Sequence, residues 1–140
     1  MAIADIMTRK VVSIGMDDTL AEVKTIFDNT KFHHLLVIQS GNLVGVVSDR
    51  DLLKAISPNL GTAAETAKDL ATLDKKVHQV MSRKPVVVNE TAAVHAAVSL
   101  INEKGVSCLP VVNDSGKVVG ILSWRDIFRE LERVRRQKHG

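Results

Sequence analysis

The residues whose types could bind a ligand occur as a motif that is present twice, each time at the end of an apolar run. Gly45-Val-Val-Ser-Asp-Arg-Asp51 returns as Gly120-Ile-Leu-Ser-Trp-Arg-Asp126, so each copy brings a serine, an arginine and an aspartate close together. A serine at a strand-to-helix junction leaves backbone N–H groups and the positive helix end available to an anion. Arginine adds a forked donor for phosphate, and a carboxylate accepts hydrogen bonds from ribose hydroxyls. The combination predicts a nucleotide site in each copy.

The same pattern also has a purely structural interpretation. Ser-x-x-Asp in front of an apolar helical run is typical of a helix N-cap. A single copy is more typical of a cap than of a binding site. The residues alone leave two interpretations open: a cap only, or a cap whose remaining atoms bind a nucleotide.

The duplication extends beyond this motif. Asp5-Ile-Met-Thr-Arg-Lys10 returns as Gln79-Val-Met-Ser-Arg-Lys84, and one residue is inserted in the turn Asn113-Asp114-Ser115-Gly116. A unit of half this length is marginally stable alone, so the two repeats are expected to pack in one globule with pseudo-twofold symmetry. We expect residues 1–57 to form the first repeat, 58–78 a helical connector, and 79–140 the second repeat with a basic C-terminal helix.

Hydrophobic periodicity predicts the element order β-α-β-β-α in each repeat, which is an α/β (α+β) fold. Thr19 and Glu22 have the spacing of a capping box. In the first repeat we expect a strand at 11–14, a helix from 20 to about 30, strands at 34–38 and 43–47, and a helix at 48–56. In the second we expect a strand at 86–88, a helix at 92–103, strands at 109–112 and 118–122, and a helix from Trp124.

The apolar spacing also predicts a helix from Thr62 to Val80. Pro110 is expected at the edge of a sheet or at the start of a strand.

The composition and charge of the chain limit the classes of function that it could have. The chain has 140 residues and a formal charge of +3, and its single cysteine, Cys108, allows neither an internal disulfide nor a cysteine-based zinc site. No apolar run is long enough for a membrane span and no signal-peptide pattern opens the chain, so a cytoplasmic protein is expected. The basic excess lies between Ile127 and Gly140. This favours a solvated helix end over a nucleic-acid interface, where basic residues spread along a face.

The remaining histidine, cysteine and serine side chains do not form a recognisable catalytic site. The adjacent His33 and His34 face opposite sides of a strand, and no nearby carboxylate or cysteine completes a zinc site, so no metal is expected. They are interpreted as a strand-start pair or as a phosphate contact. Cys108 is interpreted as a small buried hydrophobe. Ser48 and Ser123 lack the Gly-x-Ser-x-Gly elbow of a nucleophile, so we predict that the protein is not an enzyme.

With these motifs the chain resembles the cystathionine β-synthase (CBS) domain family, in the stand-alone tandem form called a Bateman module. Met7-Thr-Arg-Lys10 and Met81-Ser-Arg-Lys-Pro85 match the family's opening, and Ser107-Cys-Leu-Pro-Val-Val112 matches its central strand. The resemblance implies adenine-nucleotide or S-adenosyl ligands (AMP, ADP, ATP or S-adenosylmethionine) in clefts between the two units. It implies a regulatory ligand rather than an obligatory cofactor, and a homodimer that signals to an effector protein.

The resemblance also implies which residues contact the ligand. Asp51 and Asp126 would hold the ribose hydroxyls, and Ser48 and Ser123 would reach the phosphates. The implied ligand-binding set is completed by Lys10, Val11, Val12, His33, His34, Leu35, Arg50, Lys84, Pro85, Val86, Ser107, Cys108, Leu109, Pro110 and Arg125.

The two copies differ at positions that matter for a ligand. Ser107 stands where the first repeat has His33, and Trp124 stands where it has Asp49. The sequence therefore predicts two inequivalent sites, with the half that carries His33 favoured for a phosphate chain. The function we expect is an adenosyl-ligand sensor that acts through ligand-linked changes in conformation or partner affinity. The alternatives are a structural interaction and dimerisation module with degenerate sites, or a nucleic-acid-binding protein acting through the basic helix.

Overall fold

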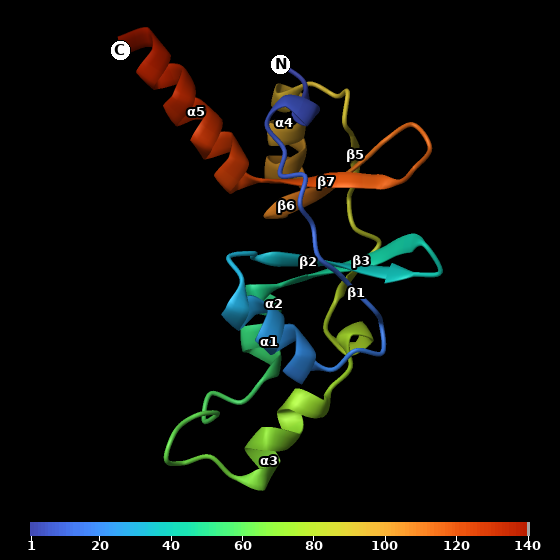
Figure 1. Cartoon of the computed structure of the whole chain (residues 1–140), viewed down its shortest axis with the longest axis vertical. Coiled ribbons are helices and arrows are strands. Elements are labelled where there is room, and N and C mark those ends of the chain that lie inside the picture. Colours follow the sequence, from blue (N-terminus) through green and yellow to red (C-terminus); the bar gives the residue numbers. More distant parts are fainter. Residues whose placement is uncertain (140) are drawn as a thin grey trace. The chain divides into compact units, whose positions relative to one another are not determined.

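The computed structural model describes the backbone of residues 1–139 and the side chains of residues 1–138. The chain forms two compact units. We call Val12–Lys84 the continuous unit, and Met1–Val11 together with the chain from Pro85 onward the split unit. Figure 1 labels their elements. The opening segment of the first repeat thus belongs with the second repeat, so the compact units divide the chain differently from the sequence repeats.

The continuous unit contains a four-stranded sheet in the order β1-β2-β3-β4. Its strands are β1 (Ser13–Ile14), β2 (His34–Gln39), β3 (Asn42–Ser48) and β4 (Ser82–Arg83). β1 runs parallel to β2, whereas β2 with β3 and β3 with β4 are antiparallel. The predicted hairpin of β2 and β3 is confirmed. β4 was not predicted as a strand, because a pair of polar residues carries no periodic signal.

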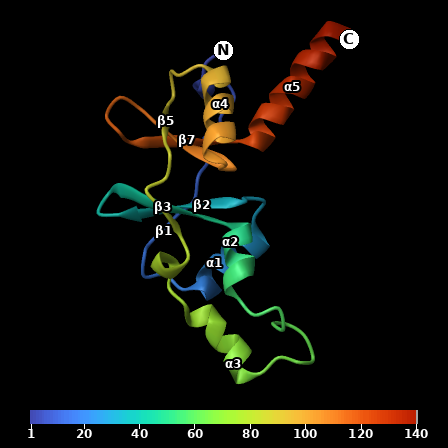
Figure 2. The ribbon, with the colours of Figure 1, turned by 180° about the vertical axis from the view of Figure 1, so that it is seen from behind.

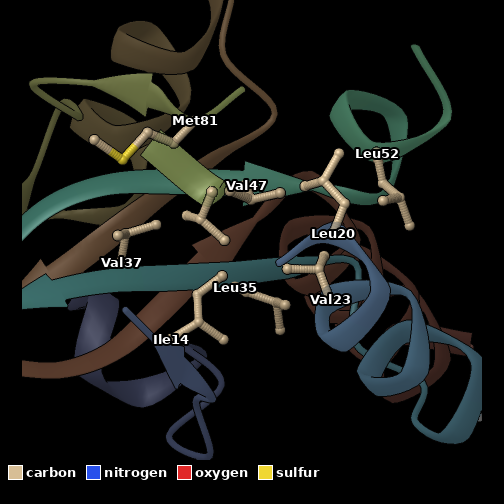
Figure 3. Packing of buried hydrophobic residues seen from close by; sticks show 9 residues of the cluster. Ile14, Leu20, Val23, Leu35, Val37, Val47, Leu52 and Met81 are labelled. Atoms are coloured by element: carbon tan, nitrogen blue, oxygen red, sulfur yellow. The ribbon is translucent and has the colours of Figure 1, made fainter. Parts of the chain in front are cut away.

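Two helices lie on one side of the β2–β3 hairpin, as Figures 1 and 2 show. They are α1 (Leu20–Asn29) and α2 (Asp49–Ala55). The predicted start of α1 is confirmed, because the Thr19 side chain accepts a hydrogen bond from the Glu22 N–H. The buried core between helices and sheet is aliphatic except for one methionine (Figure 3). It consists of Ile14, Leu20, Val23, Leu35, Val37, Val47, Leu52, Val77 and Met81.

The connector is not the single helix predicted for Thr62 to Val80. It consists of α3 (Ala67–Leu70) and two 3-10 turns, η2 (Ala71–Asp74) and η3 (Val77–Gln79). The helix is interrupted because Lys75 adopts an extended backbone (φ −59°, ψ 148°), from which its carbonyl accepts a 2.9 Å hydrogen bond from the Leu20 N–H. This contact with α1 outweighs the helical propensity of the connector's sequence.

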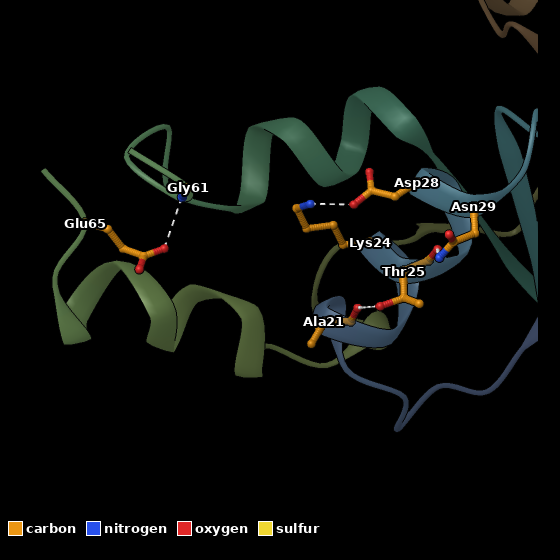
Figure 4. A network of polar contacts seen from close by, with 7 residues as sticks. All are labelled: Ala21, Lys24, Thr25, Asp28, Asn29, Gly61 and Glu65. Atoms are coloured by element: carbon orange, nitrogen blue, oxygen red, sulfur yellow. Dashed lines mark hydrogen bonds and ion pairs between the residues drawn. The ribbon is translucent and has the colours of Figure 1, made fainter. Parts of the chain in front are cut away.

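Local side-chain contacts form within the connector and within α1 (Figure 4). In the connector, the Glu65 carboxylate accepts a 3.1 Å hydrogen bond from the Gly61 N–H. On α1, Lys24 pairs with Asp28 at 2.5 Å. The Lys75 ammonium donates to the Ala55 carbonyl at the end of α2 at 2.8 Å. The connector is therefore an ordered part of the continuous unit.

The split unit contains a three-stranded sheet in the order β5-β6-β7. Its elements are η1 (Ile3–Asp5), β5 (Val88–Asn89), α4 (Val94–Lys104), β6 (Cys108–Val112), β7 (Val118–Ser123) and α5 (Trp124–His139). The predicted β-α-β-β-α order is confirmed in both repeats, although β1 and β5 are shorter than the strands predicted for residues 11–14 and 86–88. Its core consists of Ile3, Met7, Ala97, Leu109, Val111 and Leu122.

A short segment pairs with the hairpin in each unit, and a glycine makes room for it. Thr8 and Ile121 exchange two N–H to carbonyl hydrogen bonds of 2.9 Å. A Cβ at Gly120 would lie 2.8 Å from both the Met7 sulfur and the Thr8 carbonyl oxygen. In the continuous unit, a Cβ at Gly45 would lie 2.7 Å from the Met81 sulfur and 2.9 Å from the Ser82 carbonyl. Only glycine fits without moving the opening segment.

The expectation that Pro110 occupies an edge or a strand start is wrong. It is the third residue of β6, the central strand of its sheet. In the other repeat, the N–H of the equivalent Leu36 donates to the Val12 carbonyl at 3.0 Å, a bond that a proline nitrogen cannot make. β5 pairs only with Val111 and Val112, so the sheet loses little at Pro110.

Candidate functional site

In the continuous unit, Ser48 and Asp51 form a capping box at the start of α2. The Asp51 carboxylate accepts from the Ser48 N–H at 2.8 Å, and the Ser48 hydroxyl oxygen accepts from the Asp51 N–H at 3.1 Å. The cap predicted from the sequence is therefore present. Only Oδ2 of Asp51 is used in it, and Oδ1 has no hydrogen-bond partner within residues 1–138. Asp51 is half-buried, so this oxygen is a potential acceptor beside the strand end.

In the split unit, the equivalent Asp126 is more fully engaged. It is buried, with 3% of its surface exposed. Its Oδ2 accepts from the Ser123 N–H at 2.8 Å and from the Ser123 hydroxyl at 3.3 Å. Its Oδ1 accepts from the Thr8 hydroxyl at 2.8 Å and from the Arg129 guanidinium at 3.0 Å. Both oxygens are thus occupied by the protein's own donors.

The difference between the two aspartates has a local cause. Ser82 stands at the position of Thr8, and Lys54 stands at the position of Arg129. Both are exposed, and neither donates to Asp51. Neither Thr8 nor Arg129 was predicted from the sequence as a partner of Asp126. The position of Thr8 in the duplicated opening segment was the available signal.

Strand pairing brings other predicted residues beside the motif. In the continuous unit, β2 and β3 place His34 opposite Ser48. In the split unit, β6 and β7 place Cys108 opposite Ser123. In each unit, the first residue of the strand (β2 or β6) therefore lies beside the motif serine, as the proposed set of ligand-binding residues requires.

His33 lies beside an acidic residue. Its Nδ1 is 2.8 Å from Oδ2 of Asp49, and the two side chains are about equally exposed, at 40% and 41%. Its carbonyl also accepts from the Asp49 N–H at 3.0 Å. One ring nitrogen is therefore used by Asp49, and only Nε2 is left for the phosphate contact predicted from the sequence. Arg50 is exposed next to this pair.

Trp124 replaces Asp49 in the other copy and forms an aromatic cluster. The Arg125 guanidinium carbon is 4.4 Å from the centre of the indole ring, which is a cation–π distance. The Phe128 ring meets Trp124 edge to face, with 5.5 Å between the centroids. Arg125, which the resemblance placed among the ligand contacts, is thus stacked on Trp124.

The remaining predicted ligand residues differ in exposure. In the continuous unit, Val12 is half-buried, Leu35 is fully buried, and Lys84 is exposed with a positive φ of 52°. In the split unit, the side chains of Leu109 and Pro110 are buried, so these residues can offer a ligand only backbone atoms. Of the others there, Lys10 and Ser107 are exposed, and Val11, Pro85 and Val86 are half-buried.

A hollow of about 700 Å³ in the split unit lies between the start of the chain and α5. Its lining carries four acidic and three basic side chains, together with Ile6 and Gln137: Asp5, Asp126, Glu130, Glu132, Arg129, Arg133 and Arg136. The acidic side chains other than Asp5 pair with arginines of the same helix. Arg133 lowers the pKa of Glu130, and Arg135 and Arg136 lower that of Glu132. This charge balance does not favour a phosphate group.

Comparison with known proteins gives a consistent result. A family model for the CBS domain matches residues 3–58 and 77–133. A CBS domain-containing protein of Dictyostelium discoideum is 29% identical over 134 residues, which cover 94% of this chain and 92% of that protein. An uncharacterised protein of Methanocaldococcus jannaschii is 27% identical over 127 residues, which cover 91% of this chain but only 38% of that longer protein.

Solved structures have the same fold. CBSX2, whose structure was determined in complex with AMP, superposes with a TM-score of 0.75 at 27% sequence identity. The superposition covers 96% of this chain and 98% of that chain. No helix within residues 1–139 has both the length and the apolar character needed to cross a bilayer.

Proposed function

Because the chain belongs to the CBS-domain family, we propose that it is a regulatory module that binds an adenosyl ligand, with AMP as the first candidate. The family match and the AMP complex of CBSX2 support this class of ligand. The observation that carries the proposal for this chain is the unused Oδ1 of Asp51 beside a cap that already positions the carboxylate.

In the proposed site, Asp51 accepts hydrogen bonds from the ribose hydroxyls. A hydrogen bond to an ionised carboxylate is about twice as strong as one between neutral groups. His33 lies on the phosphate side, where its Nε2 is the ring nitrogen that Asp49 does not use. At Asp126, a ligand would have to displace Thr8 or Arg129. We therefore propose that Asp51 marks the stronger of two unequal sites.

The proposed mechanism is thermodynamic linkage rather than catalysis. A ligand at about 100 times its Kd stabilises the state that binds it by about 2.7 kcal/mol. It changes the affinity for an effector protein, or for a second copy of the chain, only as far as it prefers one state. We propose a cytoplasmic setting, since free adenine nucleotides are present there.

Calorimetric titration with AMP, ADP, ATP and S-adenosylmethionine tests the proposal. We expect at least one of these ligands to bind, and Asp51→Ala to weaken that binding about tenfold or more, because a charged hydrogen bond is lost. Asp69→Ala is the matched control, because Asp69 forms the capping box of α3 in the same unit. It should leave the affinity unchanged.

Two results would contradict the proposal. If none of the four ligands binds at millimolar concentration, the chain is better described as an interaction and dimerisation module with degenerate sites. If a ligand binds equally well to wild type and Asp51→Ala, the Ser-x-x-Asp motif of the continuous unit serves only as a helix cap.

A further inference from the structure

The carboxylate of Asp126 has no acceptor position to spare. An ionised carboxylate offers about four lone-pair positions, shared equally between its oxygens. The Ser123 N–H and hydroxyl fill those of Oδ2, at 2.8 Å and 3.3 Å. The Thr8 hydroxyl and the Arg129 guanidinium fill those of Oδ1, at 2.8 Å and 3.0 Å. A ligand hydroxyl can therefore bind Asp126 only after one of these donors has left.

The donors from Ser123 and Thr8 are held in place by the sheet. Ser123 is the last residue of β7. The N–H and the carbonyl of Thr8 are both hydrogen-bonded to Ile121 at 2.9 Å. The segment runs so close to β7 that a Cβ at Gly120 would lie 2.8 Å from the Thr8 carbonyl oxygen. The branched Thr8 side chain also has few alternative rotamers. These donors therefore stay beside Asp126.

Arg129 is the donor that can leave. Its side chain is 72% exposed, whereas the side chain of Asp126 is 1% exposed. Within residues 1–138, the bond to Asp126 is the only hydrogen bond that the guanidinium makes. A hydrated guanidinium on a long stem contributes little through such a pair, so its release into water costs little. Arg129 thus covers a buried carboxylate from the solvent side.

The other repeat lacks this cover. Lys54 stands at the position of Arg129, is exposed, and does not donate to Asp51. Oδ1 of Asp51 has no protein donor within residues 1–138. The residue three positions after the motif aspartate therefore distinguishes a covered acceptor from an open one.

We propose that Arg129 is a latch on a second ligand site, which a ribose hydroxyl displaces at ligand concentrations well above those that fill the Asp51 site. The inference rests on the proposed function and adds regulation to it, because the chain then responds to its ligand in two steps. A hydroxyl that replaces Arg129 keeps the buried carboxylate hydrogen-bonded, which makes the exchange feasible. Only one acceptor position opens at Asp126, so this site stays weaker than the one at Asp51.

Calorimetric titration in an Asp51→Ala background isolates the Asp126 site. The ligands are AMP, ADP, ATP and S-adenosylmethionine. Adding Arg129→Ala to Asp51→Ala should strengthen the remaining binding about tenfold or more, because the ligand no longer has to displace a donor. With Asp51 intact, Arg129→Ala should leave the tighter affinity unchanged and make a second equivalent of ligand measurable.

Arg133→Ala is the matched control. Arg133 lies on the same helix and lines the same hollow as Arg129, but it pairs with Glu130. Its replacement should leave both affinities unchanged. A gain equal to that of Arg129→Ala would mean that loss of positive charge on α5, rather than release of Asp126, strengthens binding, and would overturn the latch.

Arg129→Lys covers the case in which alanine unfolds the start of α5. Lysine keeps the positive charge, and Lys54 stands at this position in the first repeat without contacting its aspartate. We expect Arg129→Lys to strengthen the second site in the same direction as alanine. A merely structural Arg129 would give variants that melt at lower temperature without any gain in ligand affinity.

The outcomes separate this inference from the proposed function. If the wild type binds a ligand through Asp51 and neither Arg129 variant gains affinity, the latch is overturned and the proposed function stands. If the wild type and both Arg129 variants bind none of the four ligands at millimolar concentration, both are overturned. Binding that is measured only after Arg129 is replaced would support the latch and contradict Asp51 as the stronger site.

Discussion

At the scale of single residues, the two aspartates of the duplicated motif have different environments. Asp51 uses one carboxylate oxygen in its capping box and leaves the other without a protein donor within residues 1–138. Asp126 uses both, and Ser82 and Lys54, which stand at the positions of its partners Thr8 and Arg129, do not donate to Asp51. The same motif thus leaves an available acceptor in one unit and none in the other.

Asp126→Ala is expected to lower the free energy of unfolding by about 2 kcal/mol. The substitution leaves the Thr8 hydroxyl and the Ser123 N–H at the start of α5 without their acceptor, and each such loss costs about 1 kcal/mol. Chemical denaturation followed by circular dichroism measures the change. Asp51→Ala should cost less, because Asp51 accepts fewer hydrogen bonds. Equal losses would contradict the assignment of Asp126 as the structural member of the pair.

The sequence predicted the residues of the motif but not the difference between them. The capping serines follow from local spacing, and so does the pairing of each motif serine with the start of the preceding strand. Both were therefore predictable. The contact of Asp126 with Thr8 was not, because Thr8 lies 118 residues away from it in the chain. The pairing of His33 with Asp49 likewise depends on how the start of β2 meets the start of α2.

At the scale of elements, α5 combines few contacts to its own unit with many ion pairs along its length. Glu130 pairs with Arg133, and Glu132 pairs with Arg135 and Arg136. These hydrogen bonds lower the pKa of both glutamates below the ordinary value of 4.5. Arg133, Arg135 and Arg136 are thus each paired with a glutamate of the same helix, which favours a solvated helix end over a nucleic-acid surface.

Acidification should melt α5 before the rest of its unit. A carboxylate whose pKa is lowered in the folded state stabilises that state above its unfolded pKa, and the stabilisation is lost as the pH falls through the lowered pKa. We therefore expect α5 to lose helicity below about pH 4.5, measured by hydrogen exchange of its amides. Glu132→Gln should weaken this dependence because it removes two of the pairs. Protection factors of the α5 amides, which are corrected for the intrinsic pH dependence of exchange, that do not change between about pH 6 and about pH 3 would contradict the role of these pairs.

Periodicity predicted the helices and the long strands because each has a buried face of its own. It did not predict β4, whose place is set by Gly45 and Val46 on the neighbouring strand. It also predicted a continuous connector helix, since the apolar spacing does not reveal that the Lys75 carbonyl is needed by Leu20. The errors lie where a contact with a distant segment overrides a local preference.

At the scale of the whole molecule, the boundaries of the duplication and of the compact units differ. Residues 1–57, 58–78 and 79–140 remain our proposal for the two repeats and their connector. The continuous unit instead needs Met81 in its core and β4 at its sheet edge, and both come from the opening of the second repeat. The split unit needs Ile3 and Met7 from the opening of the first.

A fragment of residues 12–84 should therefore fold better than one of residues 1–78. The first contains all of the continuous unit, whereas the second lacks Met81 and the strand that pairs with Gly45. We expect cooperative urea unfolding for 12–84 and a weaker or absent transition for 1–78, followed by far-UV circular dichroism. A more stable 1–78 fragment would show that the sequence repeat, rather than the compact unit, is the folding unit.

Each compact unit contains the opening segment of the other repeat, and this affects the outcome of proteolytic cleavage between the repeats. A protease that cleaved the loop after Ser57 would not release two independent domains, because the first piece would still supply Ile3, Met7 and Thr8 to the split unit. The second piece would still supply Met81 and β4 to the continuous unit. The nicked protein would remain one particle held by two reciprocal strand contacts.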